Sequence, residues 1–67
     1  MKVDGRRVKA ARALTGLTQE RLADVLQVTP VTVVNWEKGR TQPRGDLLVR
    51  LSRLSGVPVD DFFVPER

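Results

Sequence analysis

The sequence predicts an all-α fold, a compact bundle of five short helices in a single domain that spans residues 1–67. Apolar residues recur at intervals of three and four along most of the chain, which is the spacing of one buried helix face. Single glycines and prolines separate these stretches, and good N-cap residues precede several of them. With 67 residues, the chain has no room for a second domain.

The first two predicted helices are residues 5–15 and residues 19–26. Gly16 can end the first helix, and Thr18 is a good N-cap for the second. Each helix has one apolar stripe, made of Val8, Ala11 and Leu14 in the first and of Leu22, Ala23 and Leu26 in the second.

Residues 30–38 are expected to form the third helix, although their β-branched side chains favour a strand. Thr29 and Pro30 occupy the preferred N-cap and first-turn positions, and Gly39 follows as a stop signal. No second strand exists with which this segment could pair. Local signals at both ends therefore outweigh the strand propensity.

Residues 45–55 are expected to form the fourth helix, with Leu48 and Leu51 on its inner face and Gly56 at its end. The fifth predicted helix is a single turn at residues 59–63. It follows a proline, which suits the start of a helix and fixes the backbone there.

The composition argues against several classes of function. The chain contains no cysteine and no histidine, so the usual metal sites and nucleophile–base pairs are missing. A core this small also leaves little volume for a substrate pocket. We therefore expect no enzyme activity, no metal, no cofactor and no small-molecule ligand. The apolar stretches are too short to cross a membrane and no signal sequence is visible, so the expected location is the cytoplasm.

The net charge of +4 is unevenly distributed along the chain. Residues 1–21 and 38–53 each carry a net charge of +4, whereas residues 22–37 and 54–67 each carry −2. This layout suits a polyanion held from two sides, because phosphate contacts need positive charge while a near-neutral segment can approach the bases. Solvated helix faces explain the same charges equally well, and charge alone leaves both interpretations open.

The third predicted helix has two unlike faces. Since successive residues turn by about 100°, Val33 and Trp36 point toward the core and Glu37 lies at the edge of that face. Four residues point outward: Val31, Val34, Asn35 and Lys38. Two outward valines are unusual on a surface helix, and they could meet either thymine methyl groups or another protein.

With these elements placed, the sequence resembles the lambda-repressor-like, Cro/C1-type helix-turn-helix family, also called the XRE family. The resemblance is strongest over residues 16–43, GLTQERLADVLQVTPVTVVNWEKGRTQP, and continues weakly to Phe62. The residues at the family's spacing are Leu17-Thr18-Gln19-Glu20, Leu22-Ala23, Val33, Trp36-Glu37, Gly39 and Pro43.

The resemblance implies a sequence-specific regulator of transcription, expected to be a repressor, whose partner is double-stranded DNA. It places the third helix in the major groove and the second helix across the DNA backbone. Carried over position by position, the base contacts are Pro30, Val31 and Asn35; for Asn35 the expected base is adenine, and a solvated polar residue is the alternative. The phosphate contacts are Gln19, Thr29, Lys38, Arg40 and Arg44, with one or two of Arg6, Arg7 and Lys9.

The resemblance also concerns the internal structure of the domain. Arg12 and Glu37 match a pair that forms a salt bridge between the first helix and the end of the third, although either residue could merely be exposed. Gln27 stands where the family usually has glycine, so it either adopts the left-handed conformation or the turn is built differently. Ser52 and Ser55 replace residues that are commonly apolar, which suggests a thinner core.

A homodimer is expected on DNA, because one domain reads too few base pairs to compete with non-specific sites in a genome. Its half-sites would lie about one helical turn, ~34 Å, apart. The predicted dimer interface is the apolar group Val57, Pro58, Val59, Phe62 and Phe63. Core closure is the alternative for these positions, and it is favoured for Phe62. The competing function is a protein-interaction module, antitoxin-like or an adaptor, that uses the outward valines.

Overall fold

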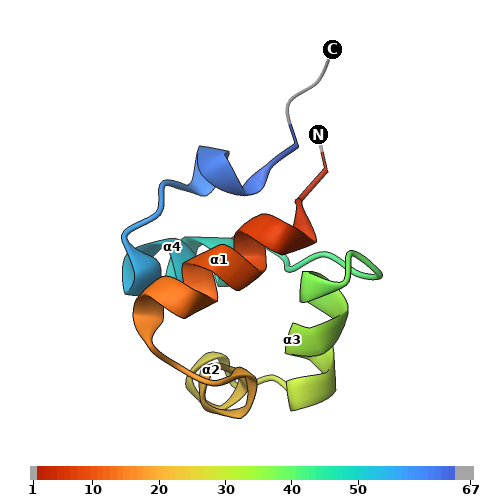
Figure 1. Cartoon of the computed structure of the whole chain (residues 1–67), viewed down its shortest axis with the longest axis vertical. Coiled ribbons are helices and arrows are strands. Elements are labelled where there is room, and N and C mark those ends of the chain that lie inside the picture. The colour runs from red at the N-terminus through yellow and green to blue at the C-terminus, as the bar shows by residue number, and fades with distance from the viewer. Residues whose placement is uncertain (1, 65–67) are drawn as a thin grey trace.

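The structure, a computed structural model, describes residues 2–64. It confirms an all-α fold and the order of the elements, which Figure 1 shows. The elements are α1 (Gly5–Thr15), α2 (Gln19–Leu26), α3 (Pro30–Glu37), α4 (Gly45–Ser55) and the short 3₁₀ helix η1 (Val59–Phe62). Within the described residues, no helix is both long enough and apolar enough to span a bilayer.

Four of the five predicted helices are α-helices, and the predicted last turn is a 3₁₀ helix, in the residues that the structure describes. In η1, the backbone N–H of Asp61 donates to the carbonyl oxygen of Pro58 at 3.0 Å, which is the i→i+3 bond of a 3₁₀ helix. Phe63 is already extended and forms an antiparallel bridge with Val3. Because Phe63 takes part in this pairing, it is not available to continue the turn as an α-helix.

The helix starts follow the local signals of the sequence. The side chain of Thr18 accepts a hydrogen bond from the backbone N–H of Arg21, and that of Thr29 accepts one from Thr32. Asp4 caps α1 in the same way. These caps satisfy backbone donors that would otherwise lack partners, so each short helix has a defined start.

Gln27, which stands where the family usually has glycine, could either adopt the left-handed conformation or require a different turn. It adopts the left-handed conformation, with φ 59° and ψ 42°, and is the only described residue other than glycine with a positive φ. Its backbone N–H donates to the carbonyl oxygen of Asp24 at 3.2 Å. The turn between α2 and α3 therefore has the same backbone that a glycine would give, at a conformational cost of about 1 kcal/mol.

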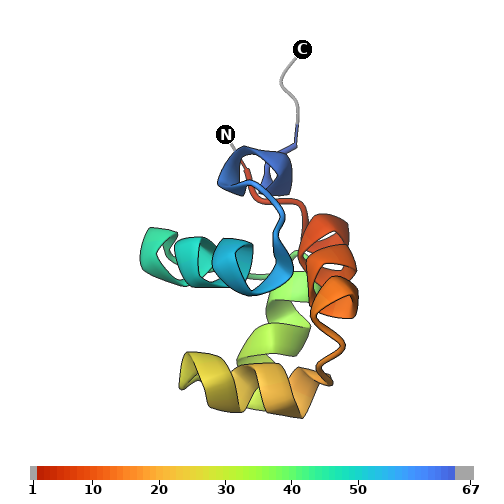
Figure 2. The same ribbon diagram turned by 90° about the vertical axis from the view of Figure 1, so that its left-hand side faces the viewer.

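One apolar core holds the helices together. Its buried residues come from every element: Val3, Val8, Ala11, Leu22, Ala23, Leu26, Val33, Trp36, Leu47, Leu48, Leu51 and Phe62. α1 packs against α3, α4 and η1, whereas α2 packs mainly against α3. As a result α2 lies at one end of the molecule and η1 at the other, as Figures 1 and 2 show.

The two ends of the described chain run side by side near η1 (Figures 1 and 2). The backbone N–H of Asp4 donates to Phe62, and that of Val64 donates to Lys2, each at 2.8 Å. Arg7 adds a side-chain contact, because its Nη1 donates to the carbonyl oxygen of Asp61 at 3.0 Å. These bonds fasten the last segment to the start of α1.

Candidate nucleic-acid interface

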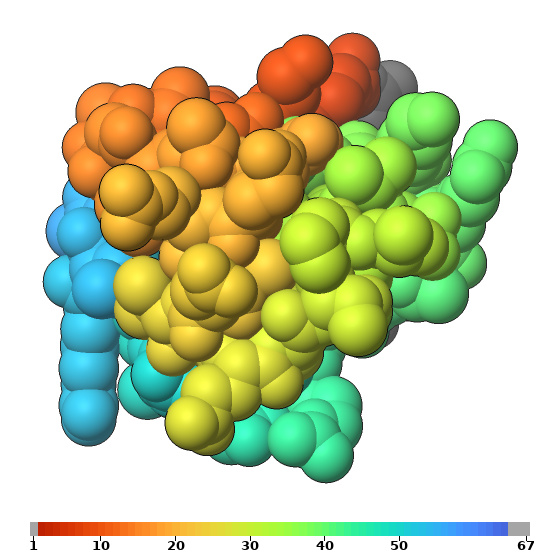
Figure 3. Space-filling view, turned by 90° about the horizontal axis from the view of Figure 1, so that it is seen from below, coloured from red at the N-terminus to blue at the C-terminus, as the bar shows by residue number. Residues whose placement is uncertain are grey.

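The helix α3 is buried on one side and open on the other. Val33 has no exposed surface and Trp36 is 3% exposed, so both fill the core. On the opposite side Pro30 is exposed and Val31 is 66% exposed, whereas Val34 and Asn35 are half-buried. The open face has no charged side chain before Lys38. Figure 3 shows α2, the turn and α3 forming one continuous face of the molecule.

A hollow of about 380 Å³ lies beside α3, between the helix and residues 41–44. Asn35 lines this hollow with Thr32, and Arg44 borders it from the other side. The Asn35 side chain is therefore accessible from the hollow, and it is less exposed than that of Val31. No local sequence pattern predicts the hollow, because its shape depends on how the chain returns from α3 to α4.

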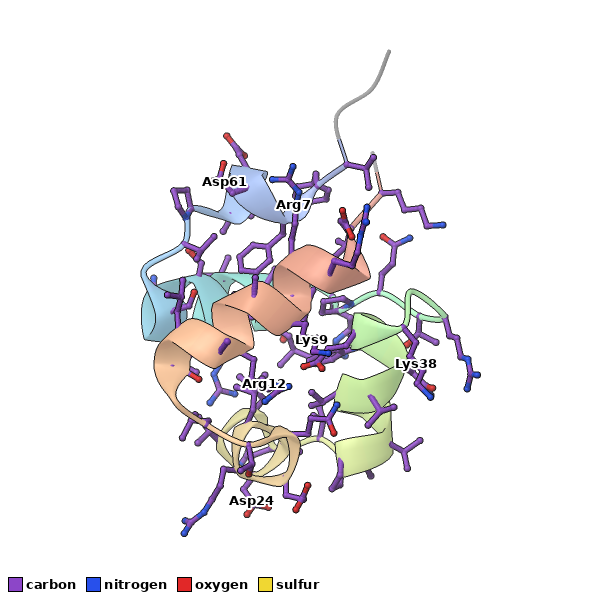
Figure 4. The ribbon with its side chains drawn as sticks, in the orientation of Figure 1. Arg7, Lys9, Arg12, Asp24, Lys38 and Asp61 are labelled. Carbon is purple, nitrogen blue, oxygen red and sulfur yellow. The ribbon has the colours of Figure 1, made fainter. Side chains whose placement is uncertain are left out.

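Three exposed cations lie at the end of α3 and in the segment that follows it. Lys38 lies at the end of α3 on its outer side (Figure 4), and Arg40 and Arg44 follow in the exposed segment before α4. Arg44 lies 3.4 Å from Asp46, but both side chains are largely exposed, so this ion pair is weak and leaves Arg44 available. Positive charge therefore borders the hollow and the end of α3.

The cations in the first half of α1 differ in their surroundings. Arg6 is 92% exposed in its side chain, and Lys9 is also exposed. Arg7 instead lies against Asp61 at the end of the molecule opposite α2, as Figure 4 shows. This contact directs the Arg7 side chain toward η1 and away from α2.

Arg12 and Glu37 lie in contact and join α1 to the end of α3. Arg12 Nε donates to Glu37 Oε2 at 2.6 Å and Nη2 donates to Oε1 at 3.3 Å. The two side chains are 17% and 4% exposed. The pKa of Arg12 is raised because Glu37 accepts its hydrogen bonds; burial acts in the opposite direction, and the negative charge of Glu37 adds to the increase.

Gln19 joins the same cluster of polar side chains. Its Nε2 donates to Glu37 Oε1 at 3.1 Å, and the side chain is half-buried at the start of α2. The sequence singled out Gln19 for phosphate contact and Glu37 for the salt bridge, but it did not connect them. Residues 18 positions apart on different helices carry no local signal of such a contact.

Gly5 is a further residue whose role the sequence did not reveal. A Cβ atom at this position would lie 2.5 Å from the carbonyl oxygens of both Trp36 and Glu37. The first turn of α1 thus abuts the last carbonyl groups of α3, and only glycine leaves room for them. Together with Arg12, this contact fixes the end of α3 that leads to Lys38.

Thr29 is exposed at the N-terminus of α3. Its hydroxyl lies 2.9 Å from that of Thr32 and also serves as the helix cap. The capping role is compatible with a phosphate contact, because a hydroxyl both donates and accepts.

The residues expected at a dimer interface divide into two groups. Phe62 has no exposed surface, so its side chain belongs to the core and is removed from the predicted interface. Pro58 is exposed, while Val57, Val59 and Phe63 are half-buried. The C-terminal end of the described chain thus offers a smaller apolar surface than the sequence indicated.

Comparison with known proteins places this arrangement in a family. A profile described as "Helix-turn-helix" matches residues 8–62, which include all four α-helices except the first residues of α1. This chain belongs to the Cro/C1-type helix-turn-helix family. It is 38% identical over 60 residues to an uncharacterised HTH-type transcriptional regulator of Methanocaldococcus jannaschii, covering 90% of this chain and 91% of that protein.

Further proteins are similar to this chain in sequence and in fold. An uncharacterised HTH-type transcriptional regulator of Archaeoglobus fulgidus is 34% identical, over 87% of this chain and 83% of its own. The P22 c2 repressor, crystallised with a synthetic operator, superimposes with a TM-score of 0.79 at 26% identity, covering 98% of this chain and 100% of that one. The clp gene regulator ClgR of Corynebacterium glutamicum gives 0.72 at 29% identity, over 87% and 74%. The protein is a DNA-binding transcriptional regulator.

Proposed function

We propose that the protein is a sequence-specific repressor that binds double-stranded operator DNA as a homodimer, with α3 in the major groove. The observation that carries the proposal is the asymmetry of α3, which is held in the core by Val33 and Trp36 while Val31 is 66% exposed on the opposite side. A helix fixed in this way can enter a groove without losing its own packing. The P22 c2 repressor, which was crystallised with a synthetic operator, supports the binding of operator DNA by this chain.

The proposed base contacts come from the open face of α3. Pro30 and Val31 present apolar surface near the N-terminus of the helix, where a thymine methyl group can be recognised. Asn35 lies one turn further along, and its amide can both donate to and accept from the edge of an adenine. These three residues would give the protein its sequence preference.

The proposed phosphate contacts surround this face. Lys38, Arg40 and Arg44 supply positive charge at the end of α3 and in the following segment, and Gln19 and Thr29 supply hydrogen-bond donors at two helix N-termini. Such contacts fix the register of the protein on the duplex but carry no sequence information. The protein would work in the cytoplasm, beside the DNA.

The proposed dimer uses Val57, Pro58, Val59 and Phe63 at the C-terminal end of the described chain. Two copies joined there would present two α3 helices to successive major grooves, and specificity would rise because two half-sites are read together. Repression would then follow from an operator that overlaps a promoter.

A salt titration tests DNA binding against the competing function, a protein-interaction module. With about six phosphate contacts, the affinity for duplex DNA should fall about a thousandfold between 50 and 200 mM salt. Lys38→Ala should lower the slope of log affinity against log salt by about one. Arg53→Ala is the matched control, because it removes the same charge from the last turn of α4 and should leave the slope unchanged. An affinity that barely changes with salt would contradict the proposal and favour a protein partner for the valines of α3.

A further inference from the structure

The side-chain amide of Gln19 has a defined orientation in this fold. Its Nε2 lies 3.1 Å from Glu37 Oε1. A carboxylate can only accept hydrogen bonds, so the amide must turn its nitrogen, and not its carbonyl oxygen, toward Glu37. The amide would otherwise rotate freely between two orientations that have the same shape but opposite hydrogen-bonding character.

The carboxylate that sets this orientation is itself held in place. Both of its oxygens accept hydrogen bonds from Arg12, and the side chain of Glu37 is only 4% exposed. Arg12 is held in turn, because its Nη1 donates to the carbonyl oxygen of Leu17 at 3.1 Å. The chain of contacts from Leu17 through Arg12 and Glu37 leads to Gln19 and connects α1, α2 and α3.

An oriented nitrogen matters because Nε2 carries two protons. One proton is directed at Glu37, and the other has no partner among residues 2–64. Phosphate oxygens, like carboxylate oxygens, only accept hydrogen bonds. An amide with the opposite orientation would present its carbonyl oxygen and repel a phosphate.

We propose that Glu37 is a positioning residue for DNA binding, which orients the amide of Gln19 so that its second N–H meets a backbone phosphate. This inference rests on the proposed function, since it assigns Glu37 a task beyond its salt bridge. Arg12 makes the task possible, because its positive charge neutralises a carboxylate that would otherwise oppose a nearby phosphate. The pair Arg12–Glu37 therefore directs a donor toward the DNA without adding net negative charge.

The orientation can be tested in the free protein by NMR of the Gln19 side-chain amide. We expect one Nε2 proton to be shifted downfield and to exchange slowly with solvent in the wild type. Glu37→Gln should abolish this signature, because glutamine can accept or donate and no longer dictates the orientation. Arg12→Lys should preserve it, since that variant weakens the salt bridge but keeps the carboxylate. Identical Gln19 signals in all three proteins would overturn the inference.

The consequence for DNA is tested by a double-mutant cycle on a selected duplex, at a temperature where every variant is folded. Gln19→Ala should weaken binding about tenfold in the wild type and in the Arg12→Lys background, as loss of one hydrogen bond to a charged group does. In the Glu37→Gln background the same change should cost only about fivefold, because an amide that is free to take either of two orientations presents its nitrogen to the phosphate about half of the time. Lys38→Ala serves as the control and should cost the same in all three backgrounds.

The outcomes separate a positioning role from a structural one. If Glu37 only stabilised the fold, Gln19→Ala would weaken binding equally in every background, and the inference would be wrong. Glu37→Asp replaces Glu37→Gln if that variant does not fold, because the shorter side chain withdraws the acceptor from Gln19. A wild type that binds no duplex at all would refute the proposed function and the phosphate contact with it, while the NMR signals would still decide the orientation of the amide.

Discussion

At the scale of single residues, Gly5 is the clearest case of a side chain excluded by its neighbours. A Cβ at this position would lie 2.5 Å from two carbonyl oxygens of α3, so Gly5→Ala must push the helices apart. We expect a loss of about 1–3 kcal/mol in the free energy of unfolding, as in other overpacked sites. Urea denaturation measures it directly.

Gly45 provides a matched control for this prediction. It is the first residue of α4, as Gly5 is of α1, but nothing lies within 4 Å of the Cβ that it would gain. Gly45→Ala should therefore be neutral or stabilising by up to about 1 kcal/mol. Equal effects of the two substitutions would show that the contact between α1 and α3 is looser than the structure has it.

Arg12 is a second residue whose replacement should lower the stability of the fold. Glu37 would remain 4% exposed without its cation, and an uncompensated carboxylate is costly to bury. We expect Arg12→Ala to lower the free energy of unfolding by about 3 kcal/mol. A loss below about 1 kcal/mol would indicate a pair that behaves as an exposed one.

At the scale of the elements, the turn between α2 and α3 depends on the left-handed Gln27. A glycine should relieve its backbone strain, and the gain is reduced by the greater freedom of glycine in the unfolded chain. We expect Gln27→Gly to raise the free energy of unfolding by about 0.5 kcal/mol and Gln27→Val to lower it by about 1–2 kcal/mol.

Thermal unfolding of the two Gln27 variants, followed by circular dichroism, checks this prediction. Gln27→Asn is a useful third variant, since asparagine tolerates the left-handed region better than most residues and should resemble the wild type or exceed it. If the valine variant were as stable as the glycine variant, the turn would not have the observed backbone.

The helices also show which parts of the fold can be predicted from the sequence. The four α-helices were predictable because their signals are local: Thr18 and Thr29 cap the helix starts, and the apolar stripes mark the buried faces. The last turn was also predictable in position, but its 3₁₀ form and its end at Phe62 were not, because they depend on the pairing of Phe63 with Val3 from the other end of the chain. Pairing of distant segments has no local pattern.

The candidate site likewise has features that the sequence could predict and features that it could not. The sequence could predict the open face of α3 and the cations around it, because both follow from the order of residues within one short segment. The link from Gln19 to Glu37 and the close approach of Gly5 could not, because both arise only when helices pack. The burial of Phe62 was correctly preferred over an interface role, since it is one of only three aromatic residues available to close a small core.

At the scale of the whole molecule, the proposed homodimer makes DNA binding depend on a surface far from α3. Pro58 is the exposed member of that surface, so Pro58→Glu would place charge at the dimer contact without disturbing the buried core. We expect the affinity for a full operator to fall at least tenfold, because the two half-sites would no longer be bound together.

The affinity for a single half-site is the internal control for Pro58→Glu, and gel-shift titrations measure both. It should remain unchanged, since the α2–α3 face is intact. Equal losses on the full and the half operator would place the dimer contact elsewhere.

Selection of binding sites from random duplexes would show whether the outward side of α3 reads bases. The wild type should enrich a two-fold symmetric sequence with half-sites about one helical turn apart, and Asn35→Ala should lose the preference at one position of each half-site. An unchanged preference in Asn35→Ala, or no enrichment by the wild type, would show that the outward side of α3 does not read bases.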